Sequence, residues 1–283
     1  MKTKVVAIMN QKGGVGKTAT TDTVARDLAI NGYKVLLIDF DPQMSLTKQF
    51  NVDPTNIINT VQDSSTVFTN NKFPQPKNVP VNLDETASLD MLFASPSLTE
   101  YAQSGMSARE LKLKAYIKKI KKEDKYDYVV IDTAGSFGVL FNNAALSADI
   151  IILPIITASS ATDATEPFFK ELTLLSEQFD HDVEEIIFFG NMFNPVASHD
   201  KEQLEIIKNE IPKYLETQKE INNFVDLKFH SVKEIPNRTV IKDANGNHMY
   251  LREYVKMYAN NKSNRSIFDS YDSILNILTK TGE

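Results

Sequence analysis

The residues that could do chemistry begin with a segment rich in glycine and lysine, QKGGVGKTAT, at positions 11–20. Its GKT triplet matches the end of the phosphate-binding loop pattern G-x-x-x-x-G-K-[ST]. The first glycine of that pattern is replaced by Gln11, and a second lysine, Lys12, follows directly. The segment therefore predicts a phosphate site with one glycine fewer and one cation more than usual.

Such a loop can bind a nucleotide because it offers both backbone donors and a cation. Glycines let backbone N–H groups approach the phosphates, and the N-terminus of the following helix favours an anion. We expect Lys17 to reach the β- and γ-phosphates and the Thr18 hydroxyl to coordinate Mg²⁺. The predicted ATP-binding residues of the loop are Lys12, Gly13, Gly14, Val15, Gly16, Lys17, Thr18 and Ala19.

Two apolar segments elsewhere in the chain have aspartates at their C-terminal ends. VLLIDFDPQ carries Asp39 and Asp41, and YDYVVIDTAG carries Asp132. A carboxylate at the end of an apolar strand is costly unless it faces a cation or strong donors. Asp132 fits the Walker B aspartate, which holds the metal, usually through a water. An aspartate that caps the next helix is the alternative, but three such acids beside one phosphate loop favour a magnesium–nucleotide site.

A sheet must position these residues, since short apolar runs alternate with helical patterns along the chain. A helix is expected from about Thr18 to Ile30, directly after the loop. Near-continuous apolar strands that alternate with helices predict an α/β fold, a parallel and mostly doubly wound sheet with its ligand at the carboxyl ends of the strands. The expected strands are residues 4–10, 34–39, 89–94, 126–132, 149–155, 184–191 and 224–229.

Length and composition limit the classes of protein. The 283 residues are expected to form one domain, 1–283, that is soluble and cytoplasmic. No run of about 18 apolar residues suggests a membrane span, and the absence of cysteine excludes disulfides and iron–sulfur clusters. Residues 51–88 break the alternation with Asn, Thr, Ser and Pro. They could be an insertion with short helices, a partner-binding flap or a mobile loop.

The motifs QKGGVGKTATT, VLLIDFDPQ and YDYVVIDTAG, in this order and spacing, resemble the deviant Walker A ATPases, specifically the ParA/Soj partition proteins. The likeness extends through LDMLFASPSL, SADIIILPI and IPNRTVIKDA. It resembles the short, Soj-like class, without the N-terminal DNA-binding extension of the larger ParA proteins. The fold implied is that of a P-loop NTPase of the deviant Walker A type.

The resemblance also implies roles for particular residues. Lys12 would cross a dimer interface to the phosphates bound by the other subunit, Asp41 would orient or activate the attacking water, and Asp39 would support the Mg²⁺ shell. Asn191 matches the position that reads adenine through its amide, although a strand-end turn residue is an alternative. The implied catalytic residues are Lys12, Lys17 and Asp41, and the implied metal residues are Thr18, Asp39 and Asp132.

Two positions depart from the family pattern. Ala19 stands where the family usually has Thr or Ser, which costs a hydrogen bond. DTAGSFG, at 132–138, replaces the more usual proline-containing segment after Walker B, so how this loop reports the nucleotide state is left open.

The function implied is ATP-dependent plasmid or chromosome partition. ATP and Mg²⁺ would be the cofactors, and ATP binding would form a homodimer that binds DNA non-specifically on the nucleoid. A small centromere-binding, ParB-like partner would stimulate hydrolysis, and no membrane partner is expected.

Two basic segments could contact DNA. Residues 232–265 hold seven basic and three acidic residues, a net charge of +4 in a chain of −6. The segment contains IPNRTVIKDA, which aligns with a stretch that contributes to DNA binding in Soj-like proteins. Residues 109–125 carry a net charge of +5, but Leu113, Tyr116, Ile117 and Ile120 give that helix a buried face, so its lysines fit an ordinary solvated face. The predicted DNA contacts are Arg238, Lys242, Arg252 and Lys256.

Other classes of protein are alternatives to a partition ATPase, and some of them share the deviant phosphate-binding loop. A MinD-like membrane-positioning ATPase would end in a basic amphipathic helix, whereas the tail RSIFDSYDSILNILTKTGE has little positive charge and favours a helix packed on the domain. Relatives of the nitrogenase iron protein need cluster cysteines, which this chain lacks. A bacterial tyrosine kinase would carry a tyrosine-rich tail, and a non-enzymatic scaffold would leave the three acids unexplained.

Overall fold

A computed structural model describes residues 2–69, 73–81, 87–104, 109–157, 161–222 and 227–280. In these parts of the chain a nine-stranded sheet has the order β3-β4-β2-β5-β1-β6-β7-β8, with β9 paired to β7. The strands are β1 (Lys4–Ile8), β2 (Val35–Phe40), β3 (Lys77–Pro80), β4 (Ser88–Leu92), β5 (Tyr128–Thr133), β6 (Ile150–Ile156), β7 (Glu185–Phe193), β8 (Lys228–Ser231) and β9 (Ile235–Pro236).

All strand pairs are parallel except that of the edge strand β3 with β4. Strand β1 lies between β5 and β6, so the loop that follows it emerges at the middle of the sheet. Asp39 on β2 and Asp132 on β5 are register partners, which places the two carboxylates side by side at the carboxyl edge. The predicted α/β fold with a mostly parallel sheet is confirmed.

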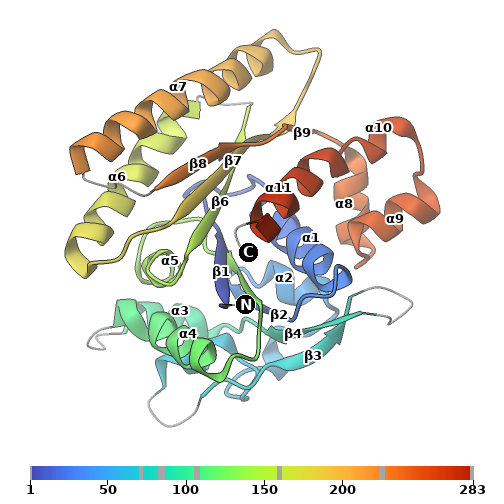
Figure 1. Ribbon diagram of the computed structural model, residues 1–283. Coiled ribbons are helices and arrows are strands. Elements are labelled where there is room, and N and C mark those ends of the chain that lie inside the picture. The colour runs from blue at the N-terminus through green and yellow to red at the C-terminus, as the bar shows by residue number, and fades with distance from the viewer. Residues whose placement is uncertain are drawn as a thin grey trace.

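Helices cover both faces of the sheet (Figure 1). One face carries α4, α5, α6 and α7, and the other carries α1, α8, α9 and α11. The α-helices are α1 (Lys17–Ile30), α2 (Ser45–Gln49), α3 (Ser97–Gln103), α4 (Lys112–Glu123), α5 (Val139–Ala145), α6 (Ala161–Phe179), α7 (Ser198–Asn222), α8 (Thr239–Gly246), α9 (Leu251–Tyr258), α10 (Lys262–Arg265) and α11 (Phe268–Lys280). Short 3-10 helices are η1 (Pro54–Asn56), η2 (Ser64–Phe68) and η3 (Arg109–Leu111).

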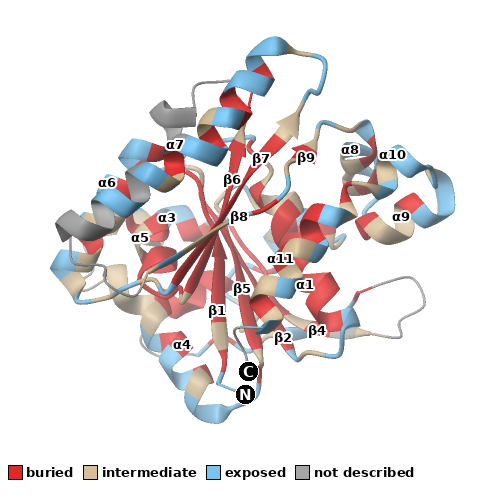
Figure 2. Cartoon of the chain, turned by 45° about the horizontal axis from the view of Figure 1, so that its top comes forward, coloured by how far each residue is buried: buried red, intermediate tan, exposed pale blue. Residues whose placement is uncertain are grey.

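The core has two halves because successive side chains of a strand point to opposite faces. In β1, Val5 and Ala7 join the half under α4 to α7, whereas Val6 and Ile8 join the half under α1 and α11. All four side chains are fully buried. Figure 2 shows the buried strands at the centre of the molecule and the exposed residues on its outer helices. This burial explains why the strands are apolar on both faces.

Residues 51–88 contain η1, η2 and β3, with residues 70–72 and 82–86 outside the described parts. The 3-10 helix η2 is buried against the core through Val67 and Phe68. The expected C-terminal helix is confirmed as α11, which packs on α1 and buries Ile274 and Leu278. Among the described residues, no helix has the length and apolar character needed to span a membrane.

Candidate functional site

The loop between β1 and α1 holds its backbone donors open at the carboxyl edge of the sheet. Asn10 anchors its start, because the side-chain amide donates to a carbonyl of β6 at 2.9 Å while Oδ1 accepts from the N–H of Lys12 at 2.8 Å. Among the described residues, the N–H groups of Gly13, Gly14 and Gly16 meet no acceptor within the chain. Ideal Cβ atoms at Gly13 and Gly14 would meet nothing within 4 Å. An anion can therefore approach this backbone directly.

Asn191, at the end of β7, closes the loop on one side. Its Nδ2 donates to the carbonyl of Val15 at 2.7 Å, and its Oδ1 accepts from the N–H of Met192 at 2.9 Å. The structure thus brings the predicted adenine-reading amide against the phosphate loop. Its recognition of adenine stays a prediction.

Lys17 begins α1 and is buried beneath the loop, with 7% of its surface exposed. Its ammonium donates to the carbonyl of Lys12 at 3.1 Å. Burial lowers the pKa of Lys17, while the charges of Asp132 and Asp41 raise it. A Cβ atom at Gly135, in the segment that follows β5, would lie 3.1 Å from the Lys17 ammonium, so glycine at this position leaves room for the lysine.

Thr18 and Asp132 are joined directly. The Thr18 hydroxyl donates to Oδ2 of Asp132 at 2.8 Å, and the hydroxyl of Thr21 lies 3.1 Å from Oδ1. Asp132 is fully buried, and burial, with the neighbouring charge of Asp39, raises its pKa. The structure therefore places the predicted Walker B carboxylate behind the hydroxyl that is predicted to coordinate Mg²⁺.

Asp39 and Asp41 have different surroundings although they are two residues apart. Asp39 is fully buried, and its Oδ2 accepts from both the N–H and the hydroxyl of Thr47, at 2.8 and 2.6 Å. Its Oδ1 accepts from the N–H of Asp41 at 3.2 Å. The Asp41 carboxylate is half-buried, lines the cavity and accepts from the N–H of Gln43 at 2.9 Å. Burial raises the pKa of both carboxyls, that of Asp39 to about 6.

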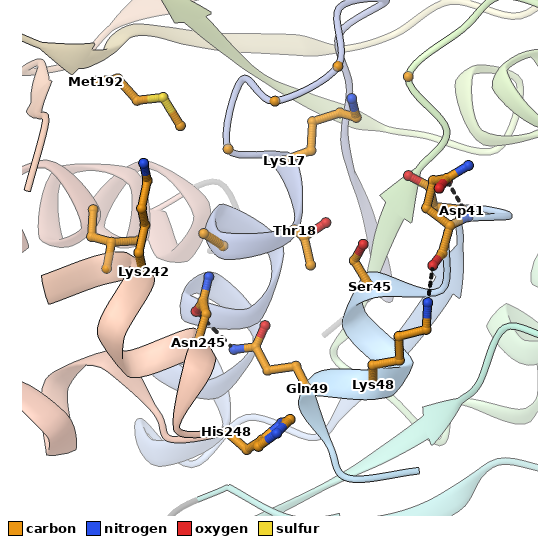
Figure 3. Close-up of a pocket in the computed structure, with 17 residues that line it drawn as sticks. Lys17, Thr18, Asp41, Ser45, Lys48, Gln49, Met192, Lys242, Asn245 and His248 are labelled. Atoms are coloured by element: carbon orange, nitrogen blue, oxygen red, sulfur yellow. Dashed lines mark hydrogen bonds between the residues drawn. The ribbon is translucent and has the colours of Figure 1, made fainter. Parts of the chain in front are cut away.

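These groups surround a cavity of about 530 Å³ beside the loop (Figure 3). Loop residues and Asp41 line it on one side, and helices α2 and α8 complete it. The lining residues that the sequence did not predict are Gln43, Ser45, Lys48, Gln49, Gly135, Met192, Ile241, Asn245 and His248. Lys12 is half-buried but does not line this cavity.

The residues present fit a magnesium ion held mainly by phosphates. Among the described residues, no group of three or more histidines and acids could bind a metal alone. Mg²⁺ keeps several waters and takes one or two carboxylates together with substrate phosphates, a requirement that Thr18 and Asp132 satisfy. Both oxygens of Asp39 are occupied by Thr47 and Asp41. Its support of the metal shell stays a prediction, and the geometry shows that it positions the Asp41 segment.

The predicted DNA residues lie in different surroundings. Arg252 donates to both carboxylate oxygens of Asp27 at 2.7 Å and to Asp272 at 2.6 Å, so its charge holds α9 to α1 and α11. Lys242 lines the cavity. Lys256 is exposed on α9.

Arg238 is half-buried just before α8, and its Nε has no hydrogen-bond partner in the described structure. The predicted buried face of the basic helix at 109–125 is confirmed in α4. Two lysines of this basic segment pair with acids of neighbouring segments: Lys121, on α4, with Asp149 at 2.8 Å, and Lys125, just after α4, with Asp90 at 2.7 Å.

Comparison with known protein families shows the family to which this chain belongs. Residues 3–185 match the AAA domain family, and the match includes the glycine loop, β2 and β5 with their acids. The chain belongs to the AAA domain family. Its resemblance to the ParA/Soj-like partition ATPases within this family is confirmed by the relatives it matches.

This AAA chain is similar to the cell division protein PomZ of Myxococcus xanthus, with 30% identity over 214 residues that cover 73% of this chain and 63% of PomZ. It is 28% identical to the chromosome partitioning protein ParA of the same organism, over 69% of this chain and 67% of that protein. Its fold matches that of Cyanothece McdA, solved as a variant in complex with ATP, with a TM-score of 0.74, 17% identity and coverage of 98% and 97%. The match with PomZ leaves more than a third of the length of PomZ uncovered.

Proposed function

We propose that this chain is an ATP-dependent DNA-partition ATPase that binds one ATP with Mg²⁺ in the cavity at the glycine loop. One observation carries the proposal: the Thr18–Asp132 hydrogen bond lies at the same cavity as the Lys17 ammonium and the Asp41 carboxylate. A P-loop ATPase needs these groups together. The similarity to a chromosome partitioning protein and to the fold of McdA supports the choice.

Each group has a task in the proposed site. The open N–H groups of the loop bind the phosphates, and Lys17 reaches the β- and γ-phosphates. Bound Mg²⁺, held by Thr18 and through water by Asp132, would neutralise charge that develops on the phosphates. Asp41 orients the attacking water from the side of α2, and Asp39 fixes the backbone of Asp41. Asn191 holds the loop on the adenine side.

Lys12 acts across a dimer in this proposal. Its carbonyl accepts from Lys17, while its side chain is absent from the lining of its own cavity. In a dimer that sandwiches two nucleotides, each Lys12 would meet the phosphates held by the partner. ATP binding and dimerisation would then depend on each other, because a second cation offsets phosphate charge only when both subunits are present.

DNA binds, in this proposal, to the exposed cations of α9 and α10. Lys256, Lys262 and Arg265 are exposed there, and none forms an ion pair with another described residue. Arg252 is left out of this surface because Asp27 and Asp272 balance its charge. A dimer carries the surface twice, so ATP-dependent dimerisation would raise the affinity for DNA phosphates. A ParB-like partner would then stimulate hydrolysis and reset the dimer on the nucleoid.

Size-exclusion chromatography with ATP, ADP and no nucleotide, combined with phosphate release, tests the ATPase and the dimer. We expect a dimer only with ATP, and slow, Mg²⁺-dependent phosphate release. Co-sedimentation with anionic liposomes tests the MinD-like alternative, which requires sedimentation. We expect none for this chain, because α11 buries its apolar residues against α1. A monomer under all three conditions would contradict the sandwich dimer.

A further inference from the structure

One cation at the cavity has no task within the fold. Lys242 lies on α8 and lines the cavity together with Ala19, Met192 and the glycine loop. Figure 3 shows its side chain extending from α8 toward Met192. Within the part of the chain that the structure describes, the Lys242 side chain forms no hydrogen bond and no ion pair. Its ammonium is therefore available to a ligand.

The other two lysines that line the cavity have contacts or roles of their own, and Lys17 is assigned above to the β- and γ-phosphates. Lys17 donates to the carbonyl of Lys12 at 3.1 Å, and Lys48 donates to the carbonyl of Gln43 at 3.1 Å. A triphosphate carries more negative charge than one Mg²⁺ neutralises, and a lysine ammonium binds a phosphate through charge-assisted hydrogen bonds. Lys242 is thus a suitable group to meet the remaining charge.

Its position in the cavity indicates which phosphate it meets. Figure 3 shows Asp41, Ser45 and Lys48 on one side of Thr18, and Met192 and Lys242 on the other. In the proposed site Asp41 marks the γ-phosphate, where water attacks. Met192, next to Asn191, marks the side of the sugar and base. Lys242 therefore lies on the side of Thr18 away from Asp41, where the α-phosphate and the sugar of a bound nucleotide are expected.

At one position of the cavity, α1 contributes a methyl group in place of a hydroxyl. Ala19 lies in the first turn of α1 and lines the cavity, but its methyl group cannot donate a hydrogen bond. A threonine or serine at this position would add a donor in this turn, directly after the Thr18 hydroxyl. The chain thus places a cation from α8 at the same cavity that the methyl group of Ala19 lines.

We propose that Lys242 binds the α-phosphate of the nucleotide and replaces the hydroxyl that Ala19 lacks. This inference rests on the proposed function, since it requires that ATP or ADP binds at this cavity. It assigns Lys242 to the nucleotide and so separates it from the DNA surface of α9 and α10.

Isothermal titration calorimetry with ADP and with the slowly hydrolysed analogue AMPPNP tests the assignment. Lys242→Ala should weaken both nucleotides by a similar factor of about ten, because both carry an α-phosphate. Lys118→Ala, at an exposed lysine of α4 that belongs to neither the proposed nucleotide site nor the proposed DNA surface, is the matched control and should change neither affinity. Thermal melts establish that both variants fold.

A second variant separates an α-phosphate contact from a general effect of charge. Ala19→Thr should restore most of the affinity that Lys242→Ala loses, and Lys242→Ala should cost less in the Ala19→Thr background than in the natural chain. ADP affinity that is unchanged in Lys242→Ala, or a loss of the same size in both backgrounds, would overturn the inference. If the natural chain itself binds neither nucleotide, the proposed function fails as well. Binding that is lost in Lys17→Ala and kept in Lys242→Ala removes only this inference.

Discussion

The amide of Asn191 lies so close to Gly16 that a Cβ atom on the glycine would be 2.3 Å from Nδ2. The same Nδ2 donates to the carbonyl of Val15 at 2.7 Å. Gly16 also adopts a φ of +91°, in the left-handed region that favours glycine. The end of β7 and the phosphate loop are therefore tied together through one amide and one glycine.

Gly16→Ala should consequently lower both stability and nucleotide affinity. The strained φ and the contact with Asn191 are each expected to cost about 1–3 kcal/mol of unfolding free energy, with a lower melting temperature. Gly13→Ala is the matched control, because its Cβ would meet nothing within 4 Å. It should melt like the natural chain yet bind ATP more weakly, since its methyl group enters the space for the phosphates. Equal melting temperatures for the two variants would argue against a structural role for the close approach of Asn191 to Gly16.

Lys12→Ala and Lys17→Ala should fail at different steps. Lys17→Ala is expected to lose nucleotide binding, since Lys17 reaches the phosphates within its own subunit. Lys12→Ala should keep most of its ATP affinity as a monomer and lose the ATP-dependent dimer. Equilibrium nucleotide binding and size-exclusion chromatography measure the two steps separately. If both variants lose nucleotide affinity equally, Lys12 has no separate role across the interface.

Asp41→Ala should bind ATP and dimerise but hydrolyse it about 10²–10⁴-fold more slowly, the range typical of removing an acid–base group. Because hydrolysis resets the dimer, this variant should remain on DNA after the natural protein has left. Phosphate release and the dissociation rate from a labelled duplex measure the two effects. Normal turnover would mean that another group orients the water.

DNA affinity should depend on the exposed cations of α9 and α10. Lys256→Glu and Lys262→Glu should each weaken ATP-dependent binding to random-sequence duplexes and leave dimerisation intact. The slope of log affinity against log salt should fall by about 0.9 for each DNA phosphate that the variant no longer neutralises. Lys118→Glu makes the same change on the exposed side of α4 and serves as the control. A larger effect from Lys118→Glu would move the DNA surface to α4.

The sequence predicted the sheet because its central strands are buried on both faces and are apolar throughout. The edge strand β3, with the sequence KNVP, was not predicted because only one of its residues is buried and it carries no apolar run. The strand expected at 224–229 begins in residues outside the described parts, and β8 starts at Lys228. An edge strand pairs with a neighbouring strand on one side only. It therefore buries fewer side chains, and its sequence shows a weaker apolar pattern than that of a central strand.

The glycine loop and the three acids were predicted because their chemistry requires fixed spacing. The contributions of α2 and α8 were not, since only the fold brings these helices to the loop. Counting charges indicates Arg252 as a DNA contact, which stays a prediction, and a count of charges cannot show that Asp27 and Asp272 are its partners. The same limit applies to Asp39, whose carboxylate binds Thr47 on α2, a contact that no motif encodes.

ATP-gated DNA binding is tested by the affinity for a labelled random-sequence duplex with ATP, with ADP and without nucleotide, at one salt concentration. We expect tight binding with ATP and Mg²⁺, and binding at least about tenfold weaker in the other two conditions, because only the ATP dimer presents the cations of α9 and α10 twice. Equal affinity in all three conditions would contradict ATP-gated DNA binding.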